Sequence, residues 1–194
     1  MPRLQELFLA GTSVTDDGVA RLASLKKLRR LRLAGTKITN KALKALAACS
    51  ELEDLDVSQT KIDDAGLPDL ARLPKLKRLN LYTTGVSDAG LTTLAQFPSL
   101  RWLNLDNTEV TDAGLPKLES LKDLEFLHLG RTRITDAGVK SLTKLTRLKT
   151  LHVTRTAVSD QGAQKLQKAL PQCKVLWGDP DQKPAQKAAS PSAD

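Results

Sequence analysis

Two histidines in the chain have a spacing that metal or acid–base chemistry could use. His128 and His152 are 24 residues apart. At the same position of neighbouring strands they would lie about 4.8 Å from each other. Asn104 and Asp106 nearby supply no clear third ligand, no nucleophile is paired with a base, and no glycine-rich phosphate loop occurs. We therefore predict no catalytic, metal or cofactor site, and a protein that is not an enzyme.

The spacing of the histidines is also the period of almost the whole chain. The shared pattern is LxxLxLxxTx[VI][TSD][DN]xGLxxLxxLxx, and its seven copies begin without insertion or deletion at Leu4, Leu28, Leu52, Leu76, Leu100, Leu124 and Leu148. Aromatic residues make up only 3% of the sequence, as expected of a core built from one repeated aliphatic layer. No repeat can bury its leucines alone, so the pattern predicts a stack of strand–turn–helix units.

The remaining constant positions predict local structure. The ninth position is always threonine, whose hydroxyl can satisfy buried backbone groups of the turn. The next polar row predicts helix N-caps at Thr15, Thr39, Asp63, Ser87, Thr111, Thr135 and Ser159. A glycine that follows in six repeats predicts close packing of helix on strand. Repeat two departs from this pattern with Asn40 and Ala42.

These residues resemble the leucine-rich repeat superfamily over about residues 3–178. The TDAGL and TDAGV segments of repeats five and six look most like the helix-bearing repeats of bacterial leucine-rich repeat proteins and F-box-type repeat proteins. The resemblance implies an α/β fold, a right-handed horseshoe with a parallel sheet on its concave face and short helices on its convex face. It also implies a recognition surface, but the identity of the partner does not transfer.

The ends of the chain depart from the repeat. We predict a leucine-rich repeat domain over residues 1–178, in which a final half-repeat lays Val175 and Trp177 over the open core, and a disordered polar tail over 179–194. The N-terminus enters repeat one without a capping segment, which suggests a fragment of a longer protein. Cys49 and Cys173 are five repeats apart, over roughly 20 Å, too far for a disulfide, and are expected to be buried.

The charges predict a largely solvated surface. The net charge is +8, yet the lysines are scattered over helices and turns, so nucleic acid is an improbable partner. On the first strands, opposite charges oppose one another and are expected to neutralise each other, which we favour over a basic ligand site. These residues are Arg29, Arg30, Arg32, Glu53, Asp54, Asp56, Lys77 and Arg78.

The outward positions of the later strands are the candidate binding site. They are the third, fifth, seventh and eighth of each repeat, whose identity no structural rule is expected to fix. We predict a concave-face contact patch of Asn80, Tyr82, Trp102, Asn104, Asp106, Asn107, Phe126, His128, Arg131, His152 and Arg155. The alternative is that its aromatic residues merely cover the sheet. Repulsion between protonated imidazoles predicts weaker partner binding below about pH 6.5.

Three functions fit these observations. The first is a non-catalytic protein–protein interaction module that binds a partner on its concave face. The second is a substrate-recognition or adaptor part of a larger enzyme assembly, such as a ubiquitin ligase or a secreted effector, and the third is a self-associating structural repeat protein. We expect a monomer without membrane contact. With no signal peptide or transmembrane segment in this sequence, we expect a cytoplasmic protein, or a secreted one if the chain belongs to a longer precursor.

Overall fold

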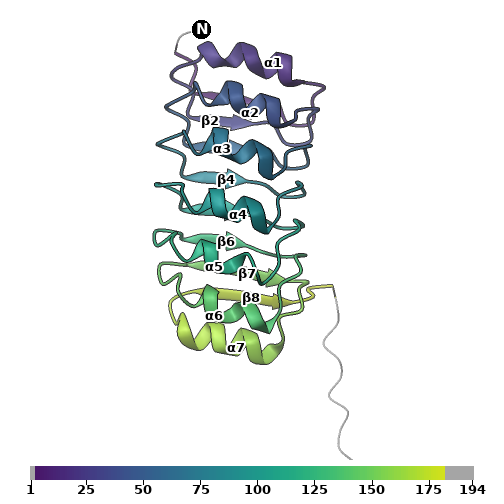
Figure 1. Ribbon diagram of the computed structural model, residues 1–194, viewed down its shortest axis with the longest axis vertical. Helices are drawn as coiled ribbons and strands as arrows, with labels where there is room; N and C mark the ends of the chain where they lie inside the picture. Colours follow the sequence, from purple (N-terminus) through teal and green to yellow (C-terminus); the bar gives the residue numbers. More distant parts are fainter. Residues whose placement is uncertain (1–2, 182–194) are drawn as a thin grey trace, which may run out of the picture.

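The computed structural model describes residues 3–181 as a single stack of repeats (Figure 1). Its eight strands form one parallel sheet in sequence order. Each residue of strands β1 to β7 pairs with the residue 24 positions later, as in Leu79 with Leu103. The strands are β1 (Glu6–Phe8), β2 (Arg30–Arg32), β3 (Asp54–Asp56), β4 (Arg78–Asn80), β5 (Trp102–Asn104), β6 (Phe126–His128), β7 (Thr150–Thr154) and β8 (Lys174–Gly178).

Short helices cover one face of this sheet (Figure 1). They are α1 (Asp16–Ala20), α2 (Asn40–Leu46), α3 (Leu67–Leu70), α4 (Asp88–Leu94), α5 (Leu115–Leu118), α6 (Val139–Leu142) and α7 (Asp160–Ala169), with 3₁₀ turns at Arg21–Ser24, Asp64–Gly66 and Asp136–Gly138. The leucine rows lie between the helices and the sheet and are almost fully buried from Leu28 onward. The α/β solenoid predicted from the repeat is therefore confirmed. We call the face of the sheet turned away from the helices the strand face.

The threonine row acts as predicted. Each threonine hydroxyl donates to the carbonyl three residues earlier, as Thr84 does to Leu81 at 2.7 Å. The N-cap row is confirmed in repeats two to seven. Thr15 is the exception, because its side chain caps no backbone N–H.

The glycine row has a different role from the predicted packing of helix on strand. A Cβ at Gly114 would overlap the Asp88 carboxylate of the preceding repeat and lie 2.8 Å from Leu91 Cδ1. That carboxylate accepts hydrogen bonds from the N–H and the hydroxyl of Thr111, at 2.8 and 2.5 Å. The same joint links the other repeats from three onward through Asp64, Asp112 and Asp136. The glycine therefore makes room for a carboxylate that fastens one repeat to the next.

Repeat one uses the same joint and repeat two a variant of it. Asp16 binds Thr39 as the other aspartates bind their partners. Asn40 exchanges two hydrogen bonds with Asp63, donating to its carboxylate and accepting from its N–H. Asn40 therefore connects repeat two to repeat three, although it replaces the aspartate of the other repeats.

The two ends of the described stack differ. The inward leucines of repeat one, such as Leu7 and Leu22, are only partly buried. At the other end, the Trp177 indole N–H donates to Asp160 at 3.0 Å across the end of the stack, although the ring stays 41% exposed. Cys49 and Cys173 are buried free thiols, as predicted. The tail predicted over 179–194 lies, from residue 182 onward, outside the described residues.

Candidate functional site

An aromatic row crosses the middle of the strand face. Trp102 on β5 and Phe126 on β6 are directly opposite in register, and their rings stack with centroids 4.7 Å apart at an interplanar angle of 8°. The guanidinium of Arg78 on β4 lies 4.5 Å from the Trp102 ring centroid. Aromatic stacking and the cation–π contact both stabilise this arrangement. The row is therefore held in place without a ligand.

A groove of about 440 Å³ runs along this row. Both aromatic rings are half-buried, so their surface is in part free for contact. The groove is lined by Lys77, Arg78, Arg101, Trp102, Glu125, Phe126, Lys149 and Thr150.

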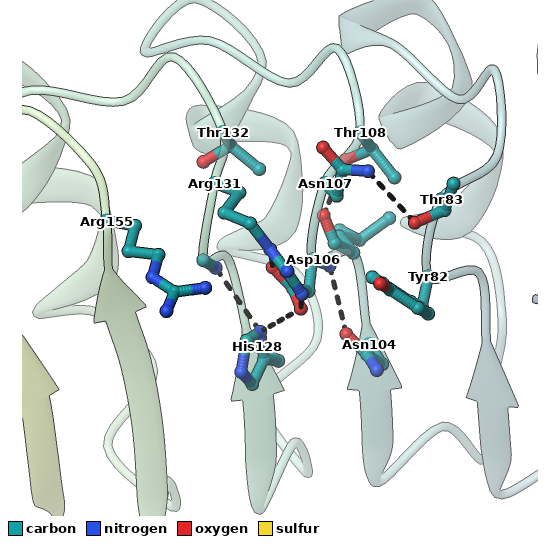
Figure 2. Close-up of polar contacts among 12 residues, drawn as sticks. Tyr82, Thr83, Asn104, Asp106, Asn107, Thr108, His128, Arg131, Thr132 and Arg155 are labelled. Atoms are coloured by element: carbon teal, nitrogen blue, oxygen red, sulfur yellow. Dashed lines mark hydrogen bonds and ion pairs between the residues drawn. The ribbon is translucent and has the colours of Figure 1, made fainter. Parts of the chain in front are cut away.

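A polar cluster follows at the carboxyl ends of the same strands (Figure 2). The buried Asp106 carboxylate accepts two hydrogen bonds from the Arg131 guanidinium, one from Nε at 2.9 Å and one from Nη2. The same guanidinium lies 5.1 Å from the Tyr82 ring centroid, and hydrogen bonding to Asp106 raises the pKa of Arg131. The geometry brings these three predicted site residues together as a fixed unit.

The two histidines stack on each other, with ring centroids 4.3 Å apart. Burial lowers the pKa of His128 to about 4, against the opposing influence of Asp106, and burial also lowers the pKa of His152. The Gly130 N–H donates to His128 Nδ1 at 3.3 Å, which requires that nitrogen to be unprotonated. The predicted pH range for repulsion between protonated imidazoles is therefore wrong. With a pKa of about 4, His128 stays neutral well below pH 6.5.

Within residues 3–181 no three His, Cys, Asp or Glu side chains are grouped so as to hold a metal ion.

Asn80 and Asn104 serve the local backbone. Their side-chain oxygens accept from the N–H two residues later, at Tyr82 (3.1 Å) and Asp106 (2.9 Å). Asn107 donates to the Thr83 hydroxyl at 2.9 Å (Figure 2). These contacts shape the turns that leave the strands.

The eighth position of the repeat is not structurally free, contrary to expectation. All seven residues there have positive φ, between 51° and 70°: Gly11, Gly35, Gln59, Thr83, Asn107, Arg131 and Arg155. This left-handed conformation suits glycine and costs other residues about 1–2 kcal/mol. The backbone therefore restricts a position that the sequence pattern leaves open.

Arg155 lines a hollow of about 180 Å³ together with Asp106, His128 and Arg131, but its ion pairs are with residues outside the predicted patch. Its guanidinium pairs with Asp179, from Nε at 3.1 Å, and with Asp181. The chain's own acidic segment thus lies over one end of the strand face.

Charges on the first strands neutralise one another, as predicted. Glu53 pairs with Arg29 at 2.6 Å and with Lys77 at 2.8 Å. Asp54 pairs with Arg30, Arg32 and Arg78 at 3.3, 2.6 and 3.5 Å.

Phe8 is an exposed aromatic residue that the sequence reasoning omitted. It occupies the fifth position of repeat one, next to Arg32, and is 59% exposed. Its outward position in the repeat was the signal that could have identified it.

One parallel strand per 24-residue repeat, buried leucine rows and a variable strand face define a solenoid of leucine-rich repeats. The chain thus has the leucine-rich repeat fold. The model of the family described as Leucine Rich repeat matches residues 24–47, 48–71, 120–142 and 144–166. No curated protein matches the chain in sequence.

Solved structures with the same fold include two from Listeria monocytogenes and one from Leptospira interrogans. An internalin (inlF) of Listeria monocytogenes is 22% identical with a TM-score of 0.75, covering 91% of this chain and 48% of its own. Internalin C2 (inlC2) of the same organism is 26% identical with a TM-score of 0.71, covering 88% and 69%. A leucine-rich repeat protein of Leptospira interrogans is 19% identical with a TM-score of 0.68, covering 90% and 49%. The chain thus spans about half the length of the first and third. Among the described residues, no helix has the length and apolar character needed to cross a membrane.

Proposed function

We propose that the strand face is a non-catalytic binding surface for a protein partner, with Trp102 and Phe126 as its anchors. The observation that carries the proposal is their half-exposed stack beside a groove of about 440 Å³. Large aromatic side chains held rigidly on a surface lose little conformational entropy on binding, and tryptophan is enriched among residues that dominate interface energies. The leucine core does not need them, because the inward rows are already buried.

A selection from a phage-displayed random peptide library tests this proposal. Peptides selected on the full chain are re-tested on a Trp102→Ala, Phe126→Ala variant and on a Phe8→Ala control, each checked for folding by circular dichroism. We expect most peptides to lose binding to the double variant and to retain it on the control, because Phe8 is an exposed aromatic on the same face outside the groove. Peptides that bind all three proteins equally would contradict the proposal.

Self-association is a second candidate function, favoured by the N-terminal end of the described stack. Leu7, Leu9 and Leu22 are only partly buried there, and within residues 3–181 strand β1 pairs with β2 alone, as an edge strand available for pairing does. Sedimentation velocity over a range of concentrations distinguishes the candidates. A sedimentation coefficient that rises with concentration would support self-association, and a constant monomer value would remove it.

A further inference from the structure

The aromatic row of the strand face has an open end at Phe126. One neighbour of Phe126 in the row is the stacked Trp102 ring, but the residue opposite it on β7 is Thr150, which has no ring. The His152 ring is tilted by 50° with its centroid 5.4 Å away, so it does not continue the stack. The groove reaches this point, because Thr150 and Lys149 line it. One aromatic side chain from a partner would extend the row by one step, since neighbouring strands are about 4.8 Å apart and stacked rings have a similar spacing.

The rim of the groove carries more positive than negative charge. Four cations line it, Lys77, Arg78, Arg101 and Lys149, with Glu125 as the one carboxylate in the lining. Lys77 and Arg78 are paired with Glu53 and Asp54 beside the groove, so the excess positive charge lies at Arg101 and Lys149. Glu125 accepts from Arg101 at 3.2 Å and from Lys149 at 2.6 Å, so two cations share one anion. The Lys149 side chain is 73% exposed. A partner that brings carboxylates to this rim would be attracted and oriented by it.

An acidic segment of the chain itself already lies at the edge of the same face. Asp179 and Asp181 pair with Arg155, and Pro180 between them lines a hollow of about 180 Å³ together with Asp106 and Arg131. This contact is an example, within the molecule, of an acidic segment bound to a cation of the strand face. Resting on the function proposed above, we propose that the partner contributes an acidic segment with one aromatic side chain, which stacks on the open side of Phe126 while neighbouring carboxylates bind the rim cations.

Single-stranded nucleic acid would also combine stacking with negative charge. Glu125 stands within the rim, and Lys77 and Arg78 pair with Glu53 and Asp54. These carboxylates interrupt the continuous positive track that a phosphate backbone requires. An acidic peptide, which can place its charges individually, fits this arrangement better.

Fluorescence anisotropy with labelled nine-residue peptides tests the proposal at 0.15 M salt. The probe is a peptide of glutamates around a central tryptophan. Its controls replace the tryptophan by alanine or the glutamates by lysines, and a thymidine decamer represents nucleic acid. We expect each peptide control to bind about tenfold more weakly than the probe, a difference of about 1.4 kcal/mol, because each control lacks either the stacking ring or the paired charges. Tighter binding of the lysine peptide or the decamer, or no effect of removing the tryptophan, would overturn the proposal.

The variant Thr150→Trp tests whether the partner's ring stacks on the open side of Phe126 or the peptide binds elsewhere on the strand face. It adds a ring where the partner's ring is proposed to sit, so we expect about a tenfold loss of binding without removal of any native contact group. Phe8→Ala should bind as the native chain does, and circular dichroism confirms that both variants fold. Unchanged binding to Thr150→Trp would refute the stacking site. If library peptides need Trp102 and Phe126 but are basic or lack aromatics, this inference fails while the proposed function stands. If no peptide depends on these two residues, both fail.

Discussion

Replacing Gly114 with alanine is expected to destabilise the protein, although alanine favours helices. The new methyl group would overlap the Asp88 carboxylate and lie 2.8 Å from Leu91 Cδ1. To relieve this overlap, the carboxylate must move away from Thr111, whose N–H and hydroxyl it now accepts at 2.8 and 2.5 Å. The substitution therefore weakens the joint between repeats four and five.

The expected change in the free energy of unfolding is the difference between a stabilising and a destabilising contribution. Alanine gains about 0.5–1 kcal/mol over glycine through helix propensity and reduced freedom of the unfolded chain. A hydrogen bond to a charged group is worth about 1.5–3 kcal/mol, and two such bonds are disturbed. We expect a net loss of about 2 kcal/mol in the free energy of unfolding, which corresponds to about 4–8 °C in melting temperature for a chain of this length. Urea titration and thermal melts followed by circular dichroism measure both quantities.

Gly18 provides the matched control. It is the same position in repeat one, where an added Cβ would meet only the flexible Val14 side chain, at 3.3 Å. Gly18→Ala should therefore leave stability unchanged or raise it by up to about 1 kcal/mol. Repeat two has a buried Ala42 at this position and keeps the joint of Asp16 to Thr39. Within residues 3–181 its partner helix α1 packs on one side only and can adjust to the methyl group, whereas α4 is packed between α3 and α5. Equal losses in Gly18→Ala and Gly114→Ala, or a gain in both, would refute the role of the carboxylate joint.

Three further predictions concern other parts of the molecule. Gln59→Gly should raise the free energy of unfolding by about 0.5 kcal/mol in urea titrations, because it relieves a φ of 55° at the expense of greater freedom in the unfolded chain. The pKa of His128 is about 4 in the fold against the ordinary 6.5, so the unfolded chain binds more protons between these values and stability falls as the pH drops from 6.5 to 4. His128→Gln should show a shallower loss of urea stability over this range, and equal slopes for both proteins would contradict the low pKa. Trp177→Phe should lower stability by about 1 kcal/mol, because it removes the bond to Asp160, and an unchanged melting curve would show that this bond contributes nothing.

The repeat allows most of the fold to be predicted from the sequence. A fixed period of 24 residues places equivalent residues side by side, so burial of the leucine rows, the threonine bonds and the opposed charges follow directly from the alignment. The neighbouring positions of Trp102 and Phe126 follow in the same way. These features depend only on which residues share a row.

Other features depend on the backbone conformation and on how deeply a side chain is buried. The position of a residue within the repeat does not specify either property. The carboxylate joint connects residues 23 positions apart, such as Asp88 and Thr111. These two residues occupy different positions of the 24-residue repeat, so aligning the repeats does not place them together. The left-handed conformation at position eight could not be predicted from the residue types, because only two of the seven residues there, Gly11 and Gly35, are glycine. The low pKa of His128 arises from burial within a stack, which spacing alone does not reveal.

Position eight also explains why the later repeats differ from the first two. Glycine occupies it at Gly11 and Gly35, whereas Thr83, Asn107 and Arg131 hold the same backbone with side chains that strain it. Strain of this kind persists where the side chain makes a contact that compensates. Asn107 bonds Thr83, and Arg131 fixes the Asp106 carboxylate. Thr83, Asn107 and Arg131 thus make contacts that glycine could not make, and they stand in the repeats that present Tyr82, Trp102 and Phe126. This coincidence is consistent with our proposal that the second half of the strand face is a rigid binding surface.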